Sequence, residues 1–535
     1  MEKNNFNNYT DLMNGLNCKG ESTVRRAICN KSLSVELSED LTLPDYLPEL
    51  RKLLRMSVIP SAPSKFVSGS SVQLGGNVEY TFCYVGNDGD MYSASFPGEY
   101  SFNVPFDSDA EYDINEGIFA DADVEVESAL SRVNSARKLN VRTRLTAKSR
   151  VLAASRIPCA ELGAEGEGEH IQRLSKSCDY STELFGSNGE IEVRDELDLE
   201  AEKARYINSE SCVFIEEVRA CDGYVECRGN VNIKYLLYRE GESTPYVLQR
   251  KSTFYEMVEV DGRCDGVAVS AYCKCVGNDA RVEEEDGTKL TNVIRLCLSA
   301  RGFKNESLEY VADAYSTEYE CECERKRYRL PIALGCGNSN MTFNASENAE
   351  TYIKVPEGGI VSVVDVCADA AIEKLEYDEN KGKYMMCGKV SFDMILTGGA
   401  DGNTELFGGS AELPFKMECA SFASEPTGFV GNAQAIEPRV RCDGEKLTFE
   451  CEIALAYSVL GENTADTVSS VSLSEHITAK NGGITVCYPD GDDSLWSVAK
   501  KYHAPLAETA SDNGIDLASG ADDSSALSGV RYLIV

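Results

Sequence analysis

The feature that most constrains the fold is a two-part pattern that occurs three times along the 535 residues. Its first part is a glycine followed by alternating apolar and polar residues, at 76–84, 229–238 and 388–396. Its second part begins with a Lys-Leu pair, at 138–145, 289–296 and 446–453. The lysine follows the glycine by 62, 60 and 58 residues, so two independent patterns stay in step. We infer three homologous repeats.

The alternation itself predicts the secondary structure, because a period of two is typical of strands with one buried face. Turn-forming pairs such as Asp443-Gly444 separate the strands, and residues 47–54 are the one short helix that we expect in the repeats. The predicted fold class is therefore mainly β, with three antiparallel β-rich repeat domains that are either sandwiches or barrels. The predicted domains are residues 1–155, 165–305 and 309–460.

Two segments at the ends of these domains are predicted to be linkers. Residues 163–169 consist largely of Gly and Glu, and residues 461–481 are polar and rich in Ser and Thr. The second linker would tether one further domain, residues 482–535, to the third repeat.

The last 54 residues have a different pattern, in which two helices lie between two short strands. Ser494 can cap the first helix, because its hydroxyl accepts from exposed amides of the first turn. Apolar residues at intervals of three and four from Leu495 form the stripe of an amphipathic helix. Pro505 suits the start of the second helix and Gly514 its end, and residues 530–535 close the chain as a strand.

This order of elements resembles the LysM family, and so do Gly491-Asp492, the helix sequence at 494–502 and the asparagine after helix two. The resemblance implies a small α+β (βααβ) domain. It also implies a shallow groove between the loop before the first helix and the loop after the second, where the family binds glycans that contain N-acetylglucosamine. The implied groove residues are Gly491, Asp492, Ser494, Leu495, Asn513, Gly514 and Ile515.

Trp496, the only tryptophan in the chain, admits two interpretations. An exposed indole at a groove could stack on a sugar ring. Its position on the first helix favours a structural role instead.

Charge narrows the range of partners. The formal net charge of −36 disfavours nucleic acid and anionic membrane surfaces, both of which bind proteins through Lys and Arg. No apolar run reaches the length of a transmembrane segment, and the N-terminus lacks the pattern of a signal peptide. We therefore expect a cytoplasmic protein.

The 21 cysteines suggest reduced core residues rather than a disulfide framework. The two Cys-x-Cys pairs, Cys273/Cys275 and Cys321/Cys323, lie in alternating stretches that predict strands. Side chains two residues apart on a strand are separated by ~6.5–7 Å, whereas a disulfide needs its Cβ atoms within about 4 Å. Oxidative cross-linking of other pairs is left open.

Catalysis is not expected. The histidines, His170, His476 and His503, lie in no motif that would pair a base with a nucleophile, and no glycine-rich phosphate loop follows a strand. No acidic cluster has the ligand spacing of a calcium loop, and no Cys-x-x-Cys pair suggests zinc. We predict no metal and no cofactor.

The whole architecture resembles SipL-type sporulation proteins, which combine repeats of the SPOCS domain with a C-terminal LysM domain. The resemblance rests on the repeated patterns, on residues 313–320 with a fainter echo at 180–183, and on residues 486–489 before the last domain. It implies a structural adaptor of spore coat assembly on the mother-cell side of the forespore surface. There the LysM domain would dock onto a coat-morphogenetic ATPase of the SpoIVA type. The alternative is a peptidoglycan-binding LysM protein whose repeats are spacers, which the missing export signal disfavours.

Overall fold

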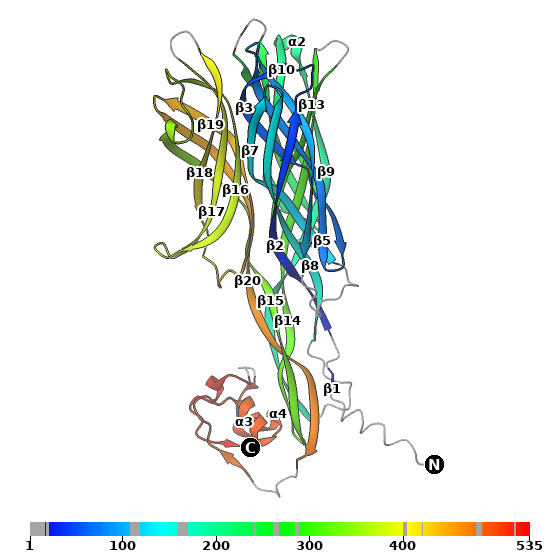
Figure 1. Cartoon of the computed structure of the whole chain (residues 1–535). Helices are drawn as coiled ribbons and strands as arrows, with labels where there is room; N and C mark the ends of the chain where they lie inside the picture. The colour runs from blue at the N-terminus through cyan, green and yellow to red at the C-terminus, as the bar shows by residue number, and fades with distance from the viewer. Residues whose placement is uncertain are drawn as a thin grey trace, which may run out of the picture.

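The computed structural model describes residues 16–17, 21–106, 118–158, 170–239, 242, 244–260, 267–283, 288–399, 404–419, 421–477, 484–517 and 521–535. Most of these residues lie in antiparallel strands, which confirms the mainly β fold class. The β units gather at one end of the molecule, and long strands run from them toward the small C-terminal module (Figure 1). Within the described ranges, no helix has both the length and the apolar character needed to cross a membrane.

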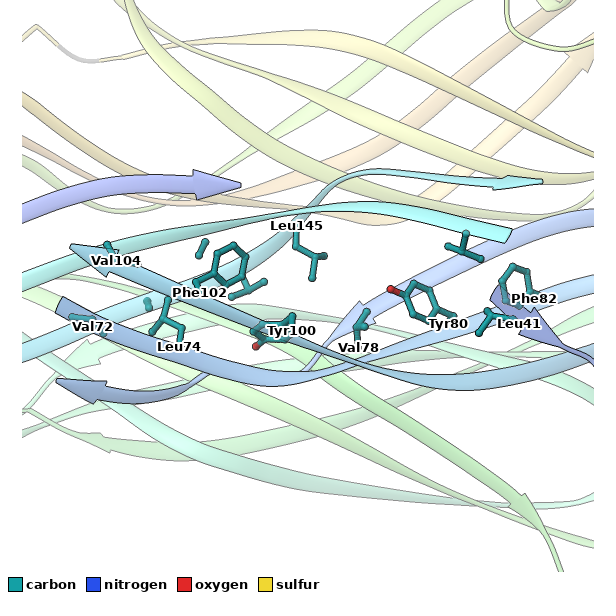
Figure 2. Packing of buried hydrophobic residues seen from close by; sticks show 14 of the residues in the cluster. Leu41, Val72, Leu74, Val78, Tyr80, Phe82, Tyr100, Phe102, Val104 and Leu145 are labelled. Atoms are coloured by element: carbon teal, nitrogen blue, oxygen red, sulfur yellow. The ribbon is translucent and has the colours of Figure 1, made fainter. Parts of the chain in front are cut away.

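The first repeat is a sandwich of two sheets. One sheet has the order β2-β8-β7, with bounds β2 Glu21–Thr42, β7 Ile118–Ser135 and β8 Lys138–Pro158. The other surrounds β5, with bounds β3 Leu50–Pro60, β4 Ser64–Ser68, β5 Ser71–Gly86 and β6 Met91–Pro105. Both sheets contribute to one apolar core, and Figure 2 shows Tyr80, Tyr100 and Leu145 among its side chains. Of the two alternatives, the repeat is therefore the sandwich.

The second and third repeats use the same strand order. In the second, the sheets are β9-β14-β13 and β10-β11-β12, with bounds β9 Ile171–Asp198, β10 Ala204–Ala220, β11 Tyr224–Arg239, β12 Tyr246–Glu259, β13 Ala268–Val282 and β14 Lys289–Ser316. In the third, they are β15-β20-β19 and β16-β17-β18, with bounds β15 Tyr319–Asn348, β16 Ile360–Asp378, β17 Lys383–Gly398, β18 Glu405–Glu418, β19 Gly428–Asp443 and β20 Lys446–His476. The short elements are β1 (Leu16–Asn17), α2 (Leu199–Glu202) and η2 (Ala349–Thr351). In each repeat the first long strand pairs with the last, which closes the unit.

The two sequence patterns occupy equivalent strands in all three repeats. The glycine pattern forms β5, β11 and β17, each of which lies in the middle of its sheet. The Lys-Leu pattern begins β8, β14 and β20, the last strand of each repeat, and each of these strands starts at the lysine. The strands predicted from both patterns are therefore confirmed.

The repeated glycine has a specific packing reason. Gly76, Gly229 and Gly388 lie directly opposite Tyr100, Phe254 and Phe415 on the neighbouring strand. In each case a Cβ atom on the glycine would approach the aromatic ring to 2.6 Å. The missing side chain thus leaves the space into which the cross-strand ring folds.

We expect Gly388→Ala to destabilise the protein by about 1–3 kcal/mol, the usual cost of overpacking a core. The new Cβ would lie 2.2 Å from the Ala371 carbonyl oxygen and 2.6 Å from the Phe415 ring, so backbone must move. Urea denaturation would measure the loss. Gly337→Ala is the matched control, because that strand glycine has open space around it. Equal midpoints for the two variants would contradict the packing argument.

Three details differ from the sequence prediction. Residues 47–54 form no helix, because β3 begins at Leu50. Bulges between Leu50 and Lys52 and between Leu53 and Arg55 interrupt the alternation of this strand, so its period resembles that of a helix.

The predicted linker at 461–481 is also wrong over most of its length, since residues 461–476 are the end of β20, paired with β15. Thr464, Ser472 and Ser474 are exposed, whereas Ala465, Thr467, Val468 and Val471 are buried, a partial alternation that the polar composition conceals. β14 likewise reaches Ser316, past the domain end expected at 305. The Gly- and Glu-rich segment at 163–169 lies outside the described residues.

These strand extensions build a stalk. We use that name for residues 171–181, 305–316, 319–332 and 461–476, which form two paired ribbons beyond the sandwiches. The ribbons contact each other and enclose small apolar clusters, and the C-terminal module lies at their far end (Figure 1).

The three repeats are arranged cyclically around one another. β3 of the first repeat contacts β18 of the third, β10 of the second contacts β6 of the first, and β16 of the third contacts β12 of the second. All three repeats supply residues to one apolar cluster, the axial core, which includes Leu54, Cys83, Ile207, Leu236 and Ile395. The repeats thus pack as an internal trimer within one chain.

Candidate functional site

The C-terminal module contains the elements that the sequence predicts. They are β21 (Val486–Cys487), α3 (Leu495–Tyr502), α4 (Leu506–Asn513) and β22 (Leu533–Ile534). The structure adds a short 3-10 helix that was not predicted, η4 (Ser524–Leu527). β21 pairs antiparallel with β22, and the buried faces of the helices and strands share one small core. The strand–helix–helix–strand order is therefore present.

The predicted groove residues before α3 have two different environments. Gly491 and Asp492 are exposed in the turn that precedes the helix. Ser494 is the N-cap: its hydroxyl accepts from the Ser497 amide at 3.1 Å, and the Ser497 hydroxyl accepts from the Ser494 amide at 3.0 Å. Leu495 belongs to the module core. Only the first two residues are free to meet a ligand.

The predicted groove residues after α4 also serve mainly to hold the module together. The Asn513 side chain donates to the carbonyl oxygens of Thr509 and Ile534 and accepts from the Ile534 amide, at 2.7–2.8 Å. It therefore fastens α4 to the C-terminal strand. Gly514 caps α4 in the left-handed conformation (φ 65°) and is exposed, whereas Ile515 packs on the core.

The module is fixed to the stalk through Asp313. This carboxylate accepts from Trp496 Nε1 at 2.8 Å and from Lys500 Nζ at 2.7 Å, both on α3, and from Arg325 of the stalk at 2.5 Å. Burial raises the pKa of Asp313, but the hydrogen bonds from Lys500 and Trp496 outweigh it, so the net shift is downward. The carboxylate is thus held in its charged form.

Further contacts surround this ion pair. The Tyr315 ring packs edge-on against the Trp496 ring, with centroids 5.0 Å apart, and its hydroxyl donates to the Ala504 carbonyl at 2.6 Å. His503 Nδ1 lies 2.9 Å from the Ser316 carbonyl oxygen. We call Asp313, Tyr315 and Ser316 the seat of the module. The seat fixes α3 at its middle and at its C-terminal end.

Trp496 has the structural role that its helix position favours. Its side chain is only 4% exposed, and both its ring and its Nε1 atom are engaged by the seat. A sugar could not stack on it while the module is docked. The seat itself is missed by motif reasoning, although residues 313–320 stand out in the sequence as a segment with a fainter echo at 180–183.

The exposed groove residues lie away from the seat. Within the described residues, no hydrogen bond or ion pair from the stalk reaches Gly491, Asp492, Asn513 or Gly514. Docking on the stalk therefore leaves both loops open to a partner.

A second cluster of functional groups lies where the repeats meet. Arg55 of β3 forms ion pairs with Glu210 of β10 at 2.9 Å and with Asp365 of β16 at 2.7 Å, and donates to Cys367 Sγ at 3.2 Å. We call these four residues the axial node. Glu210, Asp365 and Cys367 have the ligand types and proximity of a cation site. The buried guanidinium already supplies the positive charge there, so the node is an ion-paired joint between repeats.

Comparison with known proteins adds no assignment: the chain matches no protein-family model, no curated protein and no solved structure.

Proposed function

We propose that this chain is a non-enzymatic adaptor of spore coat assembly, in which the repeats form a scaffold and the C-terminal module docks onto a coat-morphogenetic protein. The observation that carries the proposal is the orientation of the module. One face is fixed to the stalk by the seat, while Gly491, Asp492 and Gly514 remain exposed on the loops of the predicted groove. A module that is fixed to the stalk and keeps its recognition loops exposed is suited to connect the repeats to a partner protein.

The choice of a protein partner over a glycan rests on what the groove offers. Sugar recognition commonly uses an exposed aromatic ring at the binding groove, and the single tryptophan is buried against Tyr315. The exposed rings of Tyr488 and Tyr532 belong to neither loop of the predicted groove. Asp492 at the rim instead offers a charged acceptor suited to a basic or amide-rich protein surface. The mother-cell location and the ATPase partner come from the resemblance to SipL-type proteins.

The scaffold role of the repeats rests on their rigidity. They form three sandwiches around a shared axial core, and buried ion pairs join them at the axial node. The repeats would thus fix the distance between the module and whatever the sandwiches contact.

Asp492→Lys in the full-length protein should weaken binding to the purified coat-morphogenetic ATPase by tenfold or more, as charge reversal at an interface typically does. Glu347→Lys is the control, since this exposed carboxylate lies on β15 far along the chain from the module. Biolayer interferometry would give both affinities. The opposite result would contradict the proposal: the wild-type protein does not bind the ATPase, it pellets with peptidoglycan sacculi, and Asp492→Lys abolishes this pelleting.

A further inference from the structure

A hollow of about 680 Å³ opens on the stalk, and strands of both ribbons line it. Its volume lies in the range of pockets that hold small molecules. The side chains that matter for its chemistry come from β9, β14, β15 and β20, and they are Lys176, Tyr310, Arg325, Arg327, Thr464 and Asp466. We call this site the basic hollow.

The charge of the basic hollow is an exception in this chain. The whole sequence has 52 Lys and Arg residues against 88 Asp and Glu residues, but the lining has three basic side chains and one acidic side chain. Arg325 and Arg327 are two positions apart on β15, so their side chains leave the strand on one face, with Cα atoms ~6.5–7 Å apart. Lys176 joins them from the other ribbon. The hollow should therefore attract an anion.

Both arginines keep N–H donors for a ligand. Arg327 donates to Asp466 from Nε at 2.6 Å and from Nη2 at 3.0 Å, and Arg325 donates to Asp313 from Nη2 at 2.5 Å. A guanidinium has five N–H donors, so these bonds use only part of each group. The side chains of Arg325 and Arg327 are 50% and 69% exposed, which leaves them accessible from the hollow.

A second observation that points to a ligand is the hydroxyl of Tyr310. This residue lies opposite Lys176 in the β14–β9 ribbon and is only 7% exposed, yet within the described ranges its hydroxyl has no hydrogen-bond partner. Burial raises the pKa of this hydroxyl, Lys176 opposes the rise, and Asp466 and Asp522 add to it, which places the hydroxyl among the charges of the hollow. Buried polar groups are normally hydrogen-bonded, so an oxygen atom of a ligand would supply the missing partner.

We propose that the basic hollow binds the phosphate groups of a small molecule, and that this ligand competes with Asp522 of the module for Lys176. Phosphate oxygens accept from guanidinium groups in bidentate pairs, which are among the strongest hydrogen bonds in proteins. Tyr310 and Thr464 add hydroxyl donors from two other strands. A diphosphate has enough charged oxygens to meet all of these donors, whereas a single carboxylate does not.

Competition for Lys176 connects the basic hollow to the docking of the module. Lys176 forms an ion pair with Asp522, which precedes η4 in the module. A bound diphosphate would draw the ammonium group away and would also repel the Asp522 carboxylate. The module would then lose one of the contacts that hold it on the stalk, through a site that lies outside both loops of the predicted groove.

Isothermal titration calorimetry of the full-length protein with inorganic pyrophosphate, at low salt and without divalent cations, tests the site. Arg327→Gln should weaken binding about tenfold, because it removes a charge-assisted contact. Arg439→Gln is the matched control and should bind like the wild type, since Arg439 is 64% exposed and pairs with Glu437 on β19. Tyr310→Phe should weaken binding severalfold without lowering the unfolding midpoint, because its hydroxyl has no protein partner to lose.

Two more titrations test the competition and the class of ligand. Asp522→Asn should tighten pyrophosphate binding severalfold, because the competing carboxylate is gone. Malonate, a dicarboxylate of similar length, should bind the wild type about tenfold more weakly than pyrophosphate does. Comparison with ADP separates two sources of the phosphates: equal binding shows that the phosphates alone are recognised, and tighter binding of ADP shows that the organic part is also held.

Four results would overturn the proposal. They are the absence of pyrophosphate binding, equal affinities of Arg327→Gln and Arg439→Gln, equal affinities for malonate and pyrophosphate, and an unchanged affinity in Asp522→Asn. The first three would remove the phosphate site, and the last would remove its competition with the module.

Discussion

Replacing Arg55 with methionine should destabilise the three-repeat body by about 3–5 kcal/mol, the usual cost of removing one partner from a buried ion pair. Arg55 is 7% exposed and Asp365 is 6% exposed, so water cannot replace the guanidinium at Asp365, whereas the Glu210 side chain is 21% exposed. Without the guanidinium, Asp365 and Glu210 would face each other at the axis with Lys234 as the remaining nearby positive charge. The three repeats should then separate or unfold at lower urea concentration.

The pH dependence of this variant has a definite sign. Burial raises the pKa of Asp365, but the charges of Arg55 and Lys234 outweigh it and the net shift is downward. In the wild type, this carboxylate contributes stability that is present above its unfolded pKa and is lost as the pH falls through the folded pKa. In Arg55→Met only Lys234 and a backbone hydrogen bond from Val366 still oppose the effect of burial, so the folded pKa of Asp365 should rise above its wild-type folded value. The deficit of the variant should therefore shrink as the pH is lowered toward 4.

Arg327→Met is the matched control for Arg55→Met. Arg327 pairs with Asp466 at 2.6 Å, but the two side chains are 69% and 50% exposed. An exposed pair of this kind contributes about 0–1 kcal/mol, so the control should unfold almost like the wild type. Adding Asp365→Asn to Arg55→Met should restore part of the lost stability, because it removes the carboxylate charge that Arg55→Met leaves without its ion-pair partner. Similar unfolding midpoints for Arg55→Met and Arg327→Met would show that the axial node contributes little.

The strands of the repeats are predictable because their determinants are local. Each central strand carries its own alternation and a glycine that faces an aromatic residue, and each last strand starts at its Lys-Leu pair. β3 escapes prediction because two bulges disturb its period. The end of β20 escapes it because a strand in an exposed ribbon needs few apolar residues, and its Ser and Thr content is typical of a linker.

The arrangement of the repeats could not be predicted in the same way. Arg55 and Asp365 occupy equivalent positions, since they pair with Cys83 and Ile395, each seven residues after its motif glycine. The third equivalent position is Asn208, opposite Leu236. Three different residue types at one repeated position carry no visible motif. Their meeting at an axis depends on packing between repeats that no local pattern records.

The candidate site shows a related limit. The family pattern correctly marks Ser494, Asn513 and Gly514 as special positions, but the structure assigns them to helix capping and to the attachment of β22. A motif combines residues that maintain a fold with residues that contact a ligand, and spacing alone does not separate them. Asp313 was beyond reach for another reason: its partners on α3 lie in a different domain.

Asp313→Ala should release the module from the stalk while leaving both domains folded. The substitution removes the acceptor of Trp496 Nε1 and of Lys500 Nζ, and hydrogen bonds to a charged group contribute about 1.5–3 kcal/mol each. The Lys500 side chain is 36% exposed, so water recovers part of that energy and the lower end of the range applies. The contacts that remain are those of Tyr315 and Ser316, the hydrogen bond from the Leu506 amide to Gln172 and the ion pair of Lys176 with Asp522, and they should not hold the module alone. Trp496 emission should shift to the red, and acrylamide should quench it more strongly.

Asp466→Ala controls for the loss of a stalk carboxylate, because Asp466 pairs with Arg327 and makes no contact with the module.

Acid should weaken the docking of the wild-type module on its seat. Asp313 has a lowered pKa in the docked state, so its contribution to docking is present above the undocked pKa of about 4 and is lost as the pH falls through the docked value. Asp313→Ala should remove this acid transition, whereas Asp466→Ala should keep it. Because Gly491 and Asp492 lie outside the seat, the released module should still bind its partner. Unchanged Trp496 emission in Asp313→Ala would mean that the aromatic contact with Tyr315, rather than the ion pair, holds the module in place.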